Sequence, residues 1–353
     1  MPAPRRQYTA TAPARTALRR EPAAKTIARA WRALTGGGRG RDASRRTLLA
    51  CSGGSDSAAL VLALAAHAQD PGALVVGHIV HDMRPRTQVL GERDRVRGLA
   101  ESLGLDFVEA AVRVRGVKGN AERTARDRRY AGLAQLASDA GCGWIATGHQ
   151  GDDLLETVLM RLVRGTGVRG LVGVHESRPL EGSAVTLIRP MLGVTRADAD
   201  RICDLGGWKP NEDPTNADTT RLRARLRHDV LPVLREVAPG VHERVLETSR
   251  VMAGISHWLD RALLGEGAVL SPNSEFVEVT LPRARAREMP AAVLAGLIRD
   301  AVRRCSGSLD KLPARAVADA CSVIQGTGTD RKVLRLPGVE VRVSAREIVL
   351  RRR

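Results

Sequence analysis

The chain has 353 residues, long enough for two or three domains, and 43% of them are hydrophobic, which suffices for a core. Lys and Arg outnumber Asp and Glu to give a net charge of +17, which indicates a polyanionic partner, nucleic acid first, although a genome-wide arginine bias is the alternative. The longest apolar stretch is far shorter than the roughly 20 residues that span a bilayer, so no membrane association is expected.

The charge is concentrated at the two ends of the chain. Residues 1–46 carry +10 and residues 331–353 carry +6, so the middle is close to neutral and the ends resemble arms or a clamp. Residues 1–22 are rich in Pro, Arg, Ala and Thr, and we expect a basic disordered tail that binds RNA or serves as a spacer. This stretch has no apolar segment typical of a secretory signal, although its composition superficially resembles a transit peptide.

The five cysteines are odd in number and include no Cys-x-x-Cys pair. This pattern argues against a disulfide framework, a zinc site and an iron–sulfur cluster, and it fits buried thiols in a reducing compartment. We therefore expect a cytoplasmic protein. The cysteines are Cys51, Cys142, Cys203, Cys305 and Cys321.

After a helical pattern at residues 24–34, apolar runs alternate with helical patterns. The predicted strands are residues 47–51, 74–81, 107–114 and 144–147. The predicted helices are residues 57–67, 88–103, 121–140 and 152–164. This alternation predicts an α/β fold with a doubly wound parallel sheet whose functional sites lie at the carboxyl ends of its strands.

The remaining patterns complete a division into three parts. A short strand at 185–189, a helix at 196–205, a polar loop at 209–216 and a basic run at 221–228 end the sheet domain. A linking helix at 241–264 leads to helical patterns within 290–324 and to strands at 332–336 and 339–350. We expect a tail at 1–22, a sheet domain at 23–235, and at 236–353 the linker helix with a smaller, mainly helical C-terminal domain whose basic end suits nucleic acid.

A glycine- and serine-rich loop follows the first predicted strand and precedes a helix. Glycines let the backbone approach an anion, and the helix start directs its N–H groups and positive dipole end at the same place. The loop lacks the Gly-Lys-Ser/Thr of a Walker A motif, and its aspartate suggests a bound Mg²⁺. The alternative is a plain turn before a core helix. The loop residues are Ser52, Gly53, Gly54, Ser55, Asp56 and Ser57.

A second polar group follows the predicted strand 144–147. His149, Asp152, Asp153 and Glu156 are three or four residues apart and share one face at a helix start. Carboxylates beside a pyrophosphate require a cation, again Mg²⁺, although acidic residues also suit the dipole of a first helical turn. We expect Asp153 and Glu156 on the exposed side of this helix.

Two further segments carry candidate residues. His81 ends the second predicted strand, at the edge where sites gather in such sheets, although a core or capping histidine is the alternative. Glu122, Arg126, Arg129 and Tyr130 share one side of the predicted helix 121–140, where a solvated charged face is the alternative.

These segments together resemble the tRNA(Ile)-lysidine synthetase family, of the N-type ATP pyrophosphatase (PP-loop) superfamily. The order and spacing of eight segments over residues 47–235 carry the resemblance, which fades after about residue 240. They are residues 52–57, 81–84, 122–130, 148–157, 164–167, 189–192, 212–216 and 223–232.

The resemblance implies the reaction. The family uses ATP to adenylate the C2 carbonyl oxygen of cytidine 34 in the CAU anticodon of tRNA(Ile), and L-lysine then displaces AMP. The product, lysidine, pairs with adenine, so codon specificity changes from AUG to AUA. A related class thiolates tRNA bases through the same activation, but it usually depends on paired cysteines or a cluster. A degenerate member that only binds tRNA is the non-enzyme alternative, and a homodimer stays open.

The resemblance also implies residue roles. The loop residues 52–57 and His81 bind ATP. Asp56 and Asp152 bind the metal, although Asp152 alternatively serves helix geometry. Asp153 and Glu156 bind and deprotonate lysine. His149, Arg129 and Arg223 position the cytidine or stabilise charge.

Overall fold

The computed structural model describes residues 12–37, 42–82, 85–113, 121–180, 182–210, 222–264, 278–306 and 312–353. The chain divides into two compact units. The first unit comprises residues up to Glu156 together with Val174–Leu246, and the second comprises Thr157–Gly173 with Glu247–Arg353. Helices α6 (Gly151–Val163) and α11 (Val241–Leu264) each run from the first unit into the second.

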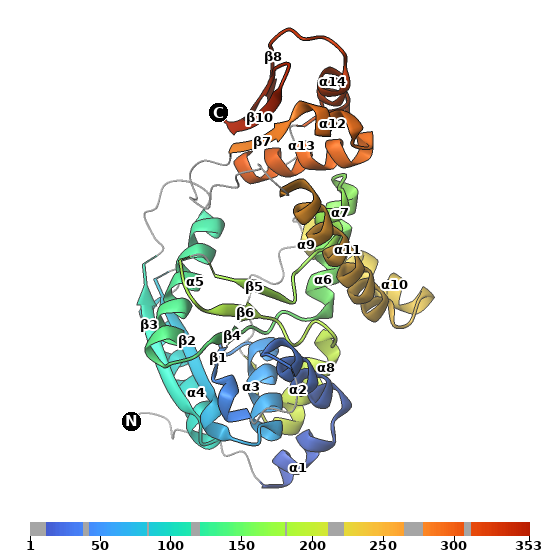
Figure 1. The fold of residues 1–353 in the computed structure, drawn as a ribbon. Coiled ribbons are helices and arrows are strands. Elements are labelled where there is room, and N and C mark those ends of the chain that lie inside the picture. The colour runs from blue at the N-terminus through green and yellow to red at the C-terminus, as the bar shows by residue number, and fades with distance from the viewer. Residues whose placement is uncertain are drawn as a thin grey trace. The chain divides into compact units, whose positions relative to one another are not determined.

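The first unit is built on a six-stranded sheet of order β3-β2-β1-β4-β6-β5 (Figure 1). Five of the strands are parallel, as the sequence predicts, and the edge strand β5 runs antiparallel to β6. The strands are β1 (Thr47–Ala50), β2 (Leu74–His81), β3 (Asp106–Val112), β4 (Trp144–Ala146), β5 (Ser177–Pro179) and β6 (Thr186–Ile188). The three-residue strand β5 is too short for a periodic signal, and the sequence analysis missed it.

The strand order reverses beside β1. The chain moves outward from β1 through β2 to β3 and then returns to β4 on the other side of β1, with Thr47 paired to both Leu74 and Trp144. Ligands of doubly wound sheets bind outside the carboxyl ends of the strands at such a switch point. The topology therefore directs attention to the loops that follow β1 and β4.

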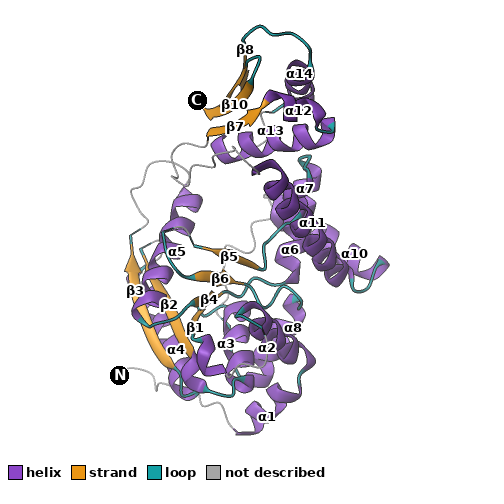
Figure 2. Ribbon diagram, in the orientation of Figure 1, coloured by secondary structure: helices purple, strands orange, loops and turns teal. Residues whose placement is uncertain are grey.

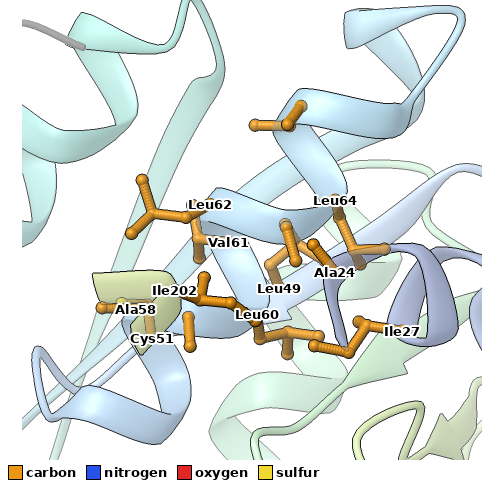
Figure 3. Close-up of a cluster of buried hydrophobic side chains, with 14 of the residues drawn as sticks. Ala24, Ile27, Leu49, Cys51, Ala58, Leu60, Val61, Leu62, Leu64 and Ile202 are labelled. Carbon is orange, nitrogen blue, oxygen red and sulfur yellow. The ribbon is translucent and has the colours of Figure 1, made fainter. Parts of the chain in front are cut away.

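Helices cover both faces of this sheet. Leu49 belongs to a core formed with α1, α2, α3, α4 and α8, whereas its neighbour Leu48 belongs to a core with α5 on the opposite face. Figure 3 shows Leu60, Val61 and Leu62 of α3 inside the first core, and all three are fully buried. The helices are α1 (Ala12–Arg20), α2 (Pro22–Leu34), α3 (Ser55–His67), α4 (Arg86–Ser102), α5 (Ala121–Asp139) and α8 (Arg196–Gly206).

The expectation of a disordered tail is wrong for residues 12–20, which form α1. Leu18 is 2% exposed, and Nε of Arg19 donates a hydrogen bond to the carbonyl oxygen of Ala66 at the end of α3 (2.8 Å). The buried leucine and the anchored arginine give this basic helix a tertiary reason to form that its composition does not reveal. Residues 1–11 lie outside the described residues.

The second unit contains helices and a four-stranded antiparallel sheet of order β7-β10-β9-β8 (Figure 2). The predicted strand 339–350 is two strands, and the sequence analysis missed β7. None of the described helices is long and apolar enough to cross a membrane. The elements are β7 (Glu278–Pro282), β8 (Lys332–Leu336), β9 (Val339–Val343), β10 (Glu347–Arg352), α7 (Val168–Leu171), α12 (Arg283–Glu288), α13 (Ala291–Ser306) and α14 (Ala314–Gln325).

Candidate active site at the carboxyl edge of the sheet

The loop between β1 and α3 has the backbone of an anion site. Gly53 has φ +90°, a left-handed conformation that favours glycine, and Gly54 is the N-cap of α3 without a side-chain cap. Oγ of Ser57 donates to the carbonyl oxygen of Gly54 (3.1 Å) and accepts from the backbone N–H of Ser52 (3.2 Å). The first N–H groups of α3 have no intrahelical partners, so they are available to a phosphate.

Three side chains from elsewhere in the first unit hold this loop in place. Nε1 of Trp208 donates to the carbonyl oxygen of Gly53 (3.3 Å), and Nδ1 of His78 lies 2.8 Å from that of Cys51. The thiol of Cys203 donates to the carbonyl oxygen of Ser55 (3.3 Å). Burial raises the pKa of Cys203 to about 12, so the thiol keeps its proton as a donor.

Gly148 brings the turn after β4 against this loop. A Cβ atom at Gly148 would lie 2.8 Å from the backbone carbonyl carbon and oxygen of Asp56 and 2.9 Å from the nitrogen of Ser57. Any larger residue would therefore push the turn away from the first turn of α3. His149 follows directly, so the absence of a side chain at residue 148 keeps His149 close to the phosphate loop.

Asp56 is a largely buried carboxylate in the first turn of α3. Its Oδ2 lies 3.4 Å from the guanidinium of Arg196, whereas its buried Oδ1 has no hydrogen-bond partner. Burial raises the pKa of Asp56 to about 6; the carboxylate of Asp153 adds to the rise, and the charge of Arg196 opposes it. A buried carboxylate oxygen without a partner suits a cation.

Asp152 is 3% exposed, with a hydrogen bond on Oδ2 and, on Oδ1, an ion pair that is not a hydrogen bond. Its Oδ2 accepts a hydrogen bond from the backbone N–H of Arg196 (3.2 Å), and its Oδ1 lies 2.5 Å from the guanidinium of Arg235. This arrangement connects the start of α6 to the start of α8. It favours the role in helix geometry over the role of metal ligand.

Asp153 and Glu156 both meet Arg223, which lies on the short helix α9 (Leu222–Arg225). The guanidinium of Arg223 lies 2.7 Å from Oδ1 of Asp153 and 2.6 Å from Oε2 of Glu156. Nε of Arg227, on the π-helical turn η4 (Leu226–Val230), lies 2.7 Å from Oε1 of Glu156. The segments α9 and η4, which carry these two arginines, lead directly into α10 (Leu231–Val237).

The prediction that Asp153 and Glu156 lie on an exposed helix side is wrong for Glu156, which is fully buried. Arg223 and Arg227 cover it and neutralise its charge, as a buried carboxylate requires. The sequence analysis assigned Arg223 to positioning the cytidine or stabilising charge, and it did not select Arg227 or Arg235 as site residues. The four-residue spacing of 223 and 227 within the basic run was the available signal.

His149 is neutral at physiological pH. Burial, followed by the charges of Arg189, Arg126 and other arginines, lowers its pKa to about 3. Its Nδ1 lies 2.9 Å from Oγ1 of Thr147, which orients the ring. His149 can therefore exchange hydrogen bonds with a ligand, but it does not supply a positive charge.

Arg129 is exposed, and its guanidinium carbon lies 5.9 Å from the centroid of the Tyr130 ring. His81 is half-buried at the carboxyl end of β2, and its buried Nδ1 has no partner. Several predicted segments cannot be placed. Residues 83–84, the side chain of Glu122 and the segment 212–216 lie outside the described residues.

The fold and this edge define a doubly wound α/β protein with a phosphate loop at its switch point. A family model of the PP-loop domain matches residues 24–234. This match covers more than half of the chain, so the chain belongs to the PP-loop family.

Two curated relatives are named tRNA(Ile)-lysidine synthase. The tRNA(Ile)-lysidine synthase of Geobacillus kaustophilus (strain HTA426) is 40% identical over 164 residues, 46% of this chain and 34% of that protein. The tRNA(Ile)-lysidine synthase of Dehalococcoides mccartyi (strain CBDB1) is 32% identical over 229 residues, 63% of this chain and 48% of that protein. The matched regions thus span about a third to a half of the length of these relatives.

Among solved structures, the chain is similar to the U34-tRNA thiolase NcsA from Methanococcus maripaludis with its 4Fe-4S cluster. The TM-score is 0.51 at 17% identity, over 66% of this chain and 81% of that one. At this identity the likeness shows the fold alone.

Proposed function

We propose that this protein ligates L-lysine to C2 of cytidine 34 in the CAU anticodon of tRNA(Ile) and releases AMP and pyrophosphate. The codon read by the tRNA changes from AUG to AUA. The observation that carries the proposal is a phosphate loop next to carboxylates at the start of α6, in a chain whose relatives are named tRNA(Ile)-lysidine synthase.

The proposed chemistry has two steps. The C2 carbonyl oxygen of cytidine attacks the α-phosphorus of ATP, and pyrophosphate leaves. The Nε of lysine, once deprotonated, attacks C2 of the adenylated base, and AMP leaves with the former carbonyl oxygen. The loop residues Ser52–Ser57 hold the pyrophosphate end of ATP through N–H groups and hydroxyls, and His81 flanks the nucleotide.

Mg²⁺ fits this assignment through Asp56, whose buried Oδ1 lacks a partner. Among the described residues no group of three His, Cys, Asp or Glu side chains could hold a metal by itself. The phosphate oxygens of ATP would therefore complete the coordination, as is usual for Mg²⁺. The ion would neutralise the charge of the leaving pyrophosphate. Asp152 is assigned to helix geometry because Arg235 already neutralises its charge on Oδ1 and the backbone of Arg196 holds its Oδ2.

Asp153 and Glu156 are assigned to lysine. The ammonium of lysine matches the charge of Arg223, which spans the two carboxylates at 2.7 and 2.6 Å, so lysine would replace or join it there. A carboxylate in this place can take the proton that the amine must lose. His149, as a neutral ring, and the exposed Arg129 are assigned to the cytidine and to developing charge.

The deciding experiment measures lysine dependence. Purified protein is incubated with ATP, Mg²⁺ and tRNA(Ile) bearing CAU, with radiolabelled lysine, with a sulfur donor, or with neither. Lysine-dependent AMP formation and label in the tRNA support the proposal. Label that follows the sulfur donor would indicate a thiolase, and tRNA binding without AMP would indicate a non-catalytic member.

We also propose that residues 236–353 distinguish tRNA(Ile) from methionine tRNA with the same anticodon, because the lysine and ATP sites cannot. The exposed Arg335, Arg342 and Arg351 of β8, β9 and β10 support this assignment. A chain truncated near residue 240 should retain some ATP binding, modify less tRNA and choose less well between the two tRNAs. Full selectivity in a folded truncated chain would contradict it. We further propose a cytoplasmic protein, and sedimentation with and without tRNA tests whether it forms a homodimer.

A further inference from the structure

Four arginines surround one buried tyrosine in the first unit, and we call this group the arginine cluster. Tyr130 is 7% exposed, and its ring centroid lies 5.5 Å from the guanidinium carbon of Arg126, 5.9 Å from that of Arg129 and 5.2 Å from that of Arg178. The fourth is Arg189, whose charge, like that of Arg126, lowers the pKa of Tyr130 against the opposing effect of burial. An aromatic ring is attractive to guanidinium groups, so it can hold several of them together.

The positive charge of this cluster is not compensated. Among the described side chains, no carboxylate forms an ion pair with any of the four arginines, whereas Arg196, Arg223, Arg227 and Arg235 nearby all pair with carboxylates. Arg189 is 4% exposed. Its NH1 donates to the carbonyl oxygen of His175 (2.6 Å), but its buried Nε has no partner. Arg178 is half-buried and Arg126 and Arg129 are exposed, so one buried and three more accessible guanidinium groups, without acidic partners in the described part of the chain, form a site that favours an anion.

The position of the cluster separates it from the phosphate loop. The phosphate loop follows β1, His149 follows β4, Arg189 follows β6, and Arg178 lies on β5, in the order of these strands across the sheet. Neighbouring strands lie about 4.8 Å apart, so Arg189 is displaced by about 10 Å from the loop. His149 lies between them, and besides burial the charges of Arg189 and Arg126 both lower its pKa. The anion of the cluster is therefore a different group from the pyrophosphate end of ATP.

We propose that the arginine cluster binds a backbone phosphodiester of the RNA, the one next to the nucleotide that is modified beside His149. This inference rests on the proposed function for the identity of the RNA. Guanidinium groups bind phosphate oxygens with paired N–H donors, and the Tyr130 ring holds the guanidinium groups of Arg126 and Arg178 in place before the RNA arrives. The cluster thereby fixes the register of the anticodon, since phosphate contacts position a nucleic acid without reading its sequence.

The test combines Arg178→Ala with a single neutral linkage in the RNA. Full-length tRNA is assembled with a methylphosphonate on either side of cytidine 34, and binding is measured by filter retention over a range of salt concentrations. For unmodified tRNA, Arg178→Ala should weaken binding about tenfold and lower the salt slope by about 0.7. For tRNA with one of the two neutral linkages, the same substitution should have no further effect.

Three controls make the outcome decisive. Arg128→Ala removes an equal charge from the exposed side of α5, and it should change neither the affinity nor the salt slope. Arg126→Ala should reproduce the effects of Arg178→Ala. Each variant is checked by thermal melting. Equal losses for the native and both neutral linkages, or no loss at all, would overturn the proposal. A loss of ATP affinity with unchanged tRNA binding would assign the cluster to the nucleotide and also overturn it.

The outcome does not depend on catalysis. Suppose that lysine is not incorporated, but that Arg178→Ala causes no further loss of binding in tRNA with one of the neutral linkages. Then the phosphodiester site stands and the proposed function falls. If lysine is incorporated and the binding losses from Arg178→Ala and from each neutral linkage are additive, the proposed function stands and this site falls.

Discussion

Replacing Asp56 with asparagine should stabilise the ligand-free protein at pH 8 and abolish AMP formation. Burial, first among its causes, raises the pKa of Asp56 from 3.8 to about 6. The native state therefore binds this proton more tightly than the unfolded chain does. The stabilising effect is complete below pH 3.8 and is lost as the pH rises through 6. At 1.36 kcal/mol for each pH unit, the ionised carboxylate costs up to about 3 kcal/mol above pH 7.

The assay is thermal melting in EDTA without nucleotide. At about 2–4 °C for each kcal/mol, Asp56→Asn should raise the melting temperature at pH 8 by up to about 6–12 °C. The rise should be about half as large at pH 5, where the native carboxylate is mostly protonated while the carboxylate of the unfolded chain is still ionised. AMP formation with tRNA and lysine is measured on the same preparations. It should be lost, because asparagine cannot hold the metal in place of a carboxylate.

Asp42→Asn is a control of opposite sign. Burial by itself raises the pKa of Asp42, but the hydrogen bonds from Arg32 and the backbone N–H of Gln69, with the charges of Arg32 and Arg45, outweigh it, so the pKa is lowered. Asp42 therefore stabilises the protein above pH 3.8, and its replacement should lower the melting temperature at pH 8. A stability change in Asp56→Asn that is negative, or that does not vary with pH, would refute the reasoning, as would AMP formation near the wild-type rate.

The remaining predictions concern three other places. Glu156→Gln should cost about 1.5–3 kcal/mol and strongly reduce lysine incorporation, whereas Arg227→Met should cost similar stability with a smaller loss of incorporation; equal losses in both assays would make Glu156 purely structural. Leu18→Ala should lower the free energy of unfolding by about 2–5 kcal/mol in urea denaturation, because α1 is packed against the core. An unchanged midpoint would indicate that α1 is a disordered tail after all. Gly148→Ala should abolish the thermal shift that ATP produces, while Gly143→Ala, with no atom within 4 Å of its added Cβ, should keep it.

Local patterns in the sequence determined the parallel sheet and the phosphate loop. The strands before the loop and before His149 are short apolar runs bounded by glycine or polar residues, and the loop needs glycine because Gly53 has a positive φ. Helix α11 begins at the predicted residue, and its apolar period continues without interruption over 241–264. Period and backbone freedom are properties of neighbouring residues, so a single sequence contains them.

The tertiary structure alone decided which charges meet. Glu156 is buried beneath arginines 67 and 71 residues away, and the indole of Trp208 holds Gly53 across 155 residues. With 56 basic side chains, the sequence offers many partners for every carboxylate, and only the order of the strands selects among them. For the same reason the sequence could not reveal that Arg178 and Arg189, from two late strands, join Tyr130 of α5 without an acidic partner. Pairing over such distances is set by the packing of the whole unit, which local periodicity does not encode.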